Sequence, residues 1–189
     1  MRTQNLHINQ LIERCKKNDT NAQMQLYNSY YKAMYNSAYR ILKDEFEAED
    51  LMQEAFLTAF TKLDTFKGEV AFGAWLKRIV INKSLTQLKK NNRYNEVKMD
   101  VIPNKEDEEE NIDYSNLNVK EVLNAIQSLK DNYRLVLTLN LIEGYDYEEI
   151  AQILKYTNEN VRTTVSRAKK KLKQVLLVNN TSKTKFYGR

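Results

Sequence analysis

The stretch from Gly144 to Lys173 constrains the fold of this chain more than any other. It reads GYDYEEIAQILKYTNENVRTTVSRAKKKLK. Apolar residues recur at helical spacing in two short segments, which a few polar residues separate, and the second segment is rich in Arg and Lys. This pattern is typical of a helix-turn-helix, whose second helix enters the major groove of DNA. We therefore expect a DNA-binding module in the C-terminal part of the chain.

The scarcity of turn residues extends the helical prediction to the rest of the chain. Only four Gly and one Pro occur among 189 residues, whereas sheet proteins need turn residues at close intervals. Hydrophobic residues make up 42% of the composition, which is enough apolar material for compact cores. The sequence therefore predicts an all-α protein. One of its helices is expected to begin near Thr20 or Asn21, which are both acceptable N-caps.

Charge divides the chain into three blocks. Residues 1–90 carry 14 basic and 10 acidic side chains, residues 91–118 carry 3 and 8, and residues 119–189 carry 13 and 7. The acidic block holds the one proline, Pro103, and cannot bury enough apolar surface to offset the entropy of ordering. We predict two small helical domains joined by an acidic linker: an N-terminal helical bundle (1–93), a flexible linker (94–117), a helix-turn-helix domain (118–178) and a disordered tail (179–189).

A helix expected over residues 47–63 places four polar side chains on one face. Met52, Phe56 and Leu63 belong to its inward side. The opposite face carries Glu49, Asp50, Gln53 and Glu54. Paired carboxylates on a helix can bind a metal or act as acid and base, but there is no Glu-x-x-His, and the single histidine, His7, is remote. The remaining interpretations are a solvated acidic face and a docking surface for a basic partner.

The next segment is a loop followed by a basic helix. The loop, residues 64–73, contains Phe66 and Phe72, and the helix AWLKRIVINKSLTQLKKNNR follows it. Basic and amide side chains beside aromatic rings suit single-stranded nucleic acid, because cations meet phosphates and rings stack on bases. The alternative is an ordinary solvated basic helix whose aromatic residues belong to the core.

The helix-turn-helix itself has recognisable boundaries. Gly144 is a plausible left-handed end of one helix, Asp146 and Glu149 form a capping-box pair, and Thr157 can cap the last helix. In that last helix we expect an inner stripe that includes Val161, Val165 and Ala168. Polar and basic residues point elsewhere, among them Asn160, Arg162, Thr163, Ser166, Arg167, Lys169 and Lys170.

Other sequence features indicate where in the cell the protein is located. A single cysteine, Cys15, excludes an intramolecular disulfide. There is no apolar run of about 20 residues for a membrane helix and no apolar signal-peptide core. These features favour a cytoplasmic protein without stable membrane insertion.

Three blocks in this order resemble bacterial RNA polymerase sigma factors of the extracytoplasmic-function (ECF) group, in the sigma-70 family. The first is LYNSYYKAMYNSAYRIL followed by EAEDLMQEAFLTAF, the second is AWLKRIVIN, and the third is GYDYEEIAQIL with NVRTTVSRAKKKL. They span about residues 20–93 and 117–177. There is no long insertion between the domains, which argues against a primary housekeeping factor.

The resemblance implies a role for each candidate site. The residues expected to bind the polymerase clamp are Glu49, Asp50, Gln53 and Glu54. Those expected at the promoter's minus-ten element, which the N-terminal domain opens, are Phe66, Phe72, Arg78, Asn82, Lys83, Thr86 and Lys89. The recognition-helix residues named above would read the minus-thirty-five element, while the C-terminal domain sits on the polymerase flap. The resemblance implies promoter DNA, core RNA polymerase and an anti-sigma factor as partners, and neither catalytic residues nor cofactors nor metals.

The chain departs from the family pattern at three positions, and two other functions compete. Thr86 and Lys89 stand where the family often has Asp and Arg, and Lys155 stands where a loop Gly is frequent. One competing function is a dimeric activator or repressor, which would bind a palindromic operator. The other is a helical enzyme that uses Glu49, Asp50 and Glu54.

Overall fold

The computed structural model describes residues 2–91 and 118–186, and the chain divides into two compact units, Met1–Asn92 and Arg93–Arg189. The N-terminal unit contains α1 (Arg2–Lys16), α2 (Thr20–Leu42), α3 (Glu45–Thr61), the short 3-10 helix η1 (Leu63–Thr65) and α4 (Phe72–Lys90). The C-terminal unit contains α5 (Val119–Ser128), α6 (Asp131–Leu137), the π-helical turn η2 (Thr138–Ile142), α7 (Tyr147–Leu154) and α8 (Asn158–Phe186). The described ranges hold no strand, so the predicted all-α class with two helical domains is confirmed.

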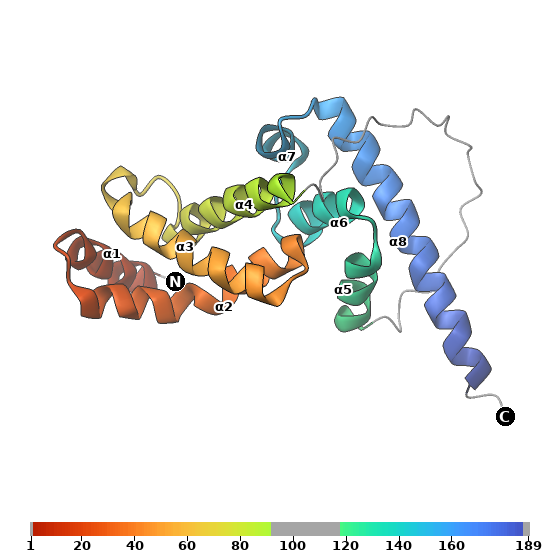
Figure 1. Ribbon diagram of the computed structural model, residues 1–189, viewed down its shortest axis with the longest axis horizontal. Helices are drawn as coiled ribbons and strands as arrows, with labels where there is room; N and C mark the ends of the chain where they lie inside the picture. The colour runs from red at the N-terminus through yellow and green to blue at the C-terminus, as the bar shows by residue number, and fades with distance from the viewer. Residues whose placement is uncertain (1, 92–117, 187–189) are drawn as a thin grey trace. The chain divides into compact units, whose positions relative to one another are not determined.

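Helix α2 is the centre of the N-terminal unit and packs against α1, α3 and α4 (Figure 1). Its buried side includes Leu26, Met34 and Ile41, each at most 2% exposed. A helix with apolar residues on so wide a face has to be covered on more than one side, which explains why three helices surround it. This packing sets the positions of α3 and α4, which carry the predicted sites.

The start of α2 differs from the prediction. The sequence suggested Thr20 or Asn21 as the N-cap, but Asp19 fills this position and accepts a hydrogen bond from the Ala22 backbone N–H at 3.1 Å. Arg14 at the end of α1 also contacts the Asp19 carboxylate, at 2.8 Å. These two bonds lower the pKa of Asp19 from its ordinary value. The carboxylate thus joins α1 to α2.

The single cysteine lies inside the N-terminal unit. Cys15 is near the end of α1, and its side chain is 3% exposed. Burial is the main reason why the pKa of its thiol is raised. The thiol is therefore protonated at neutral pH and serves as a small core residue.

The C-terminal unit is built around α6 and η2. Leu135, Leu137 and Leu139 are each at most 2% exposed, as expected for a helix buried nearly all round. Gly144 follows with φ +80, a left-handed conformation that favours glycine, as the sequence predicted. Helices α5 and α6 pack against α8, and α7 also contacts α8 (Figure 1).

The predicted linker and the predicted tail can be compared with the residues that the structure describes. The predicted linker, 94–117, lies outside them. Helix α8 continues to Phe186, which is farther than the tail predicted from residue 179 allows. The sequence from 179 to 186 has no Gly or Pro that would force the helix to end earlier. Across the described helices, none is long and apolar enough for a membrane span.

Candidate functional site

The predicted docking residues all lie on the exposed side of α3. Asp44 caps this helix by accepting a hydrogen bond from the Glu47 backbone N–H at 3.0 Å. Ala48, Met52 and Phe56 are buried on the opposite side. The four exposed residues are Glu49, Asp50, Gln53 and Glu54. The shared face is therefore present, and its docking role stays a prediction.

Two apolar residues on the same face were missed by the sequence analysis. Phe46 is 82% exposed and Leu57 is 68% exposed. With Asp50 and Gln53 they form a stripe spaced four, three and four residues apart, which runs along one side of a helix. Neither residue belongs to the predicted inward side of the helix, and both share the spacing of the polar face. These two signals could have identified them from the sequence. Exposed apolar side chains beside polar ones are a common component of protein-binding surfaces.

Tyrosines of α2 lie beside the first turn of α3. The rings of Tyr35 and Tyr39 stack at 6.1 Å between centroids, with 6° between their planes. The pKa of Tyr35 is raised by partial burial first, and then by the nearby charges of Glu45 and Glu49. The phenol therefore stays neutral next to the acidic face.

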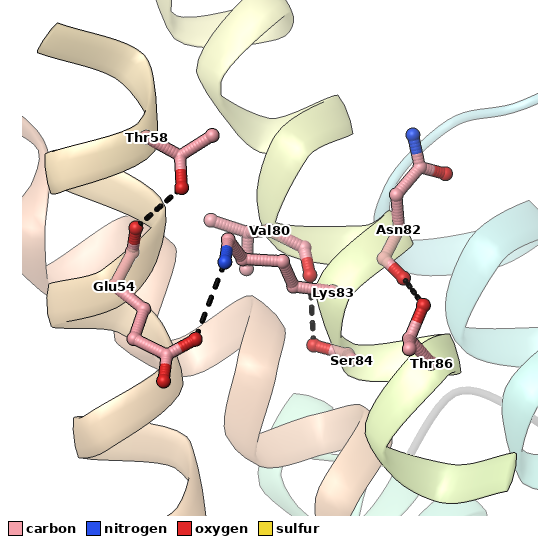
Figure 2. A network of polar contacts seen from close by, with 7 residues as sticks. All are labelled: Glu54, Thr58, Val80, Asn82, Lys83, Ser84 and Thr86. Atoms are coloured by element: carbon pink, nitrogen blue, oxygen red, sulfur yellow. Dashed lines mark hydrogen bonds and ion pairs between the residues drawn. The ribbon is translucent and has the colours of Figure 1, made fainter. Parts of the chain in front are cut away.

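An ion pair connects the docking face to the helix predicted to bind DNA. Lys83 Nζ on α4 lies 3.2 Å from Glu54 Oε2 on α3 (Figure 2). The Lys83 side chain is 30% exposed and that of Glu54 is 68% exposed, so the pair is largely solvated and contributes about 0–1 kcal/mol. The two predicted sites thus adjoin, and Lys83 already has a carboxylate partner.

Helix α4 presents one polar stripe and one buried side. Arg78, Asn82, Thr86 and Lys89 are exposed, at a spacing of four, four and three residues. The Asn82 carboxamide points away from the Glu54–Lys83 pair, whereas the Thr86 hydroxyl donates to the backbone carbonyl of Asn82 at 2.9 Å (Figure 2). The Thr86 hydroxyl proton is therefore used within the helix, and its oxygen remains as an acceptor.

One aromatic residue of the predicted DNA site is buried where the loop meets α4. Phe72, the first residue of α4, is 3% exposed and packs against Tyr30, Phe66 and Trp75 at centroid distances of 5.5, 5.6 and 5.7 Å. A ring buried on all sides has no face for a base, so the contact of Phe72 with DNA stays a prediction that requires this aromatic cluster to open. Phe66 is half-buried and keeps part of its surface open.

A glycine permits this aromatic cluster to close. A Cβ atom added at Gly73 would lie 2.8 Å from Cε1 of Tyr30, closer than real Cβ atoms approach other atoms. Any side chain at this position would displace the Tyr30 ring, which packs on Phe72. Gly73 therefore lets α4 start close to α2 and supports the loop that holds Phe66.

The helix-turn-helix forms as the sequence predicted. Asp146 and Glu149 make a reciprocal capping box at the start of α7, with bonds of 2.8 and 2.9 Å. Thr157 Oγ1 accepts from the Asn160 backbone N–H at 3.2 Å ahead of α8. Between the helices, Lys155 adopts the left-handed conformation, with φ 58, at the position where a glycine was noted as frequent.

Helix α8 separates its predicted contacts from its core. Val161, Val165 and Ala168 are fully buried, as expected. Thr163 and Arg167 are half-buried at the edge of the helix. The residues exposed to solvent are Asn160, Arg162, Ser166, Lys169 and Lys170. The arrangement offers cations for phosphates and side chains for base edges. In the described part of the chain, no group of three His, Cys, Asp or Glu residues is arranged to hold a metal.

The chain is similar to known proteins in both of its units. Residues 26–94 match the family model of sigma-70 region 2, and residues 120–172 match that of sigma-70 region 4. The ECF RNA polymerase sigma-E factor of Escherichia coli (strain K12) is 31% identical over 170 residues, which cover 84% of this chain and 88% of the relative. The ECF RNA polymerase sigma factor SigW of Bacillus subtilis (strain 168) is 29% identical, covering 89% and 96%.

A solved structure is also similar. It is the sigma factor RpoE in complex with the anti-sigma factor NepR from Bartonella quintana, with 26% identity and a TM-score of 0.56. The similarity covers 82% of this chain and 96% of RpoE.

Proposed function

The chain belongs to the ECF RNA polymerase sigma factors of the sigma-70 family, and we propose that its two units divide promoter recognition between them. It is an alternative sigma factor, which binds core RNA polymerase and directs it to specific promoters. The observation that carries the division is that one chain contains both family regions, the first with an exposed acidic face and the second with an exposed basic one. Sigma factors are not a class of enzymes, so this membership favours neither the dimeric repressor nor the helical enzyme.

Docking on polymerase is assigned to the exposed face of α3. Its carboxylates suit a basic partner surface, and complementary charge accelerates association and orients the partner. Phe46 and Leu57 supply apolar area at the two ends of the polar stripe. The acidic side chains then determine which partner is accepted, and the apolar ones contribute most of the binding free energy.

Opening of the minus-ten element is assigned to α4 and the loop before it. Arg78 and Lys89 are exposed cations for the backbone of the separated strand, and Asn82 can bond a base edge. Phe66 contacts Trp75 at 5.3 Å, so the two rings form a continuous aromatic surface. A base that leaves its stack costs a few kcal/mol, and stacking on such a surface offsets part of this cost.

Reading of the minus-thirty-five element is assigned to α8. Lys169 and Lys170 position the helix on phosphates. Arg162 and Ser166 lie in the N-terminal half of α8, the part of a recognition helix that reaches base edges. Attachment to polymerase raises the effective concentration of both DNA contacts. The free protein is therefore expected to bind DNA weakly.

The remaining partners and the location follow from the same proposal. The C-terminal unit would sit on the polymerase flap, and an anti-sigma factor would hold the protein inactive, as NepR accompanies RpoE in the similar structure. The work of the protein is binding and orientation, with no covalent step and no cofactor. Transcription takes place where the chromosome is, so we place the protein in the bacterial cytoplasm.

A binding experiment with core polymerase tests the docking assignment. Asp50→Lys reverses a charge at the centre of the face without breaking the Glu54–Lys83 ion pair, and it should weaken binding about 100-fold because like charges then meet. Glu13→Lys on α1 is the control for reversal of an exposed charge elsewhere, and it also removes the largely solvated Glu13–Lys16 ion pair, which contributes about 0–1 kcal/mol. Unfolding in urea shows whether both variants keep the fold.

A charge exchange separates docking from the ion pair. Glu54→Lys combined with Lys83→Glu restores an ion pair inside the protein but leaves a cation on the docking face. We expect this double variant to bind polymerase as poorly as Glu54→Lys alone. Full recovery of binding would show that the ion pair matters and that Glu54 does not meet polymerase.

A further inference from the structure

Arg162, on the recognition helix, is placed over an aromatic ring from the preceding helix. Its guanidinium carbon lies 6.0 Å from the centre of the Tyr147 ring, within the range of a cation–π contact. Arg162 is exposed and Tyr147 is half-buried. The contact thus joins an exposed charged side chain of α8 to the first residue of α7.

The Tyr147 ring is held in place by its surroundings. The capping box of Asp146 and Glu149 fixes the backbone on both sides of Tyr147. Ile150 and Leu154 anchor α7 in the core, at 0% and 4% exposure. The ring therefore has a defined position relative to α8, against which α7 packs.

A fixed ring changes what Arg162 can do. A free arginine side chain loses much rotamer freedom when it binds, and bidentate recognition of a base requires its planar fork in one orientation. A ring beneath the guanidinium restricts the side chain before DNA arrives. The charge remains, and so do the N–H groups at the edge of the guanidinium plane.

We propose that Tyr147 is a positioning residue for promoter specificity, which orients Arg162 for reading a base of the upstream element. The inference rests on the proposed function, because it requires that Arg162 reads a base. Tyr147 itself touches no base in this account, and its hydroxyl is not required. An alternative role, a hydroxyl bond to a phosphate, depends on that hydroxyl and is distinguished by the test.

The test uses holoenzyme made from core RNA polymerase and the full chain. The probe is a pool of duplex DNA with randomised bases upstream of a constant start region, and bound sequences are read by sequencing. Arg162→Ala identifies the base position that Arg162 reads, as the position where selectivity is lost. Tyr147→Leu should reduce selectivity at that position by about two- to fivefold. Tyr147→Phe should keep it, because the ring face remains.

The controls separate positioning from folding and from DNA contact. In the Arg162→Ala background, Tyr147→Leu should have no further effect on selectivity. Loss of selectivity at every position, or an equal effect with and without Arg162, would overturn the inference. Loss of binding in Tyr147→Phe would show a phosphate contact and overturn it as well. If Arg162→Ala leaves every preference unchanged, the base-reading role fails first; if it matters and Tyr147→Leu does not, only the inference fails.

Discussion

The exposed apolar residues of α3 allow a prediction that separates docking from folding. Phe46 and Leu57 are 82% and 68% exposed in the free protein, so most of their apolar surface still faces water. Burying a whole Phe or Leu side chain is worth about 1.5–3 kcal/mol. If polymerase covers them, replacement of either by alanine should weaken binding by about 1–2 kcal/mol, which is about five- to 30-fold.

The same substitutions should leave the fold intact. A side chain that is mostly exposed contributes little to stability, and surface substitutions usually change it by less than about 0.5 kcal/mol. Alanine also favours helix more than phenylalanine does. We therefore expect the urea midpoints of Phe46→Ala and Leu57→Ala to stay near that of the wild type.

The assay is equilibrium binding of labelled protein to core RNA polymerase. Met24→Ala is the matched control, since Met24 is 59% exposed on α2, outside the docking face of α3. It should bind as the wild type does. Wild-type affinity in both α3 variants would refute the argument that this face is buried on docking, and a drop in their stability would show that the two side chains serve the fold instead.

Two further predictions concern stability. Lys155→Gly should stabilise the C-terminal unit by about 0.5–1 kcal/mol, because the left-handed conformation costs an ordinary residue about 1–2 kcal/mol and glycine adds about 0.5–1 kcal/mol of backbone entropy. Hydrogen exchange of that unit measures the change, and Lys120→Gly in the first turn of α5 should destabilise the unit instead. Asp19→Asn should be less stable than the wild type at neutral pH, with a difference that shrinks below about pH 4. The reason is that the pKa of Asp19 is lowered in the fold, so its stabilisation is complete above the unfolded pKa and is lost as pH falls through the folded one. A difference that stays constant in urea unfolding from neutral to strongly acid pH would contradict this.

Much of the helical architecture was predictable because its signals are local. The capping pair of Asp146 and Glu149, the cap at Thr157 and the turn at Gly144 depend on residues three or four positions apart. The inner stripe of α8 follows from helical periodicity in the same way. Such features need no knowledge of how distant segments meet.

The features that were missed depend on contacts between distant segments. The sequence left open whether Phe72 is accessible or belongs to the core, and only its packing against Tyr30 on α2 shows that it is buried. The sequence did not show that Lys83 has an ion-pair partner, because Glu54 lies on a different helix, α3. The cap at Asp19 was missed for a different reason, because an N-cap and its neighbours have similar side chains and the boundary can shift by a residue.

Run-off transcription tests the central claim most directly. Core RNA polymerase is incubated with fragments of the source genome, with and without the full-length chain, and transcript starts are sequenced. We predict defined starts that require the chain, lie downstream of two elements at a constant spacing, and disappear with Asp50→Lys. If no start depends on the chain, or if the chain alone binds a palindromic site tightly as a dimer, the account of a sigma factor with two promoter contacts is contradicted.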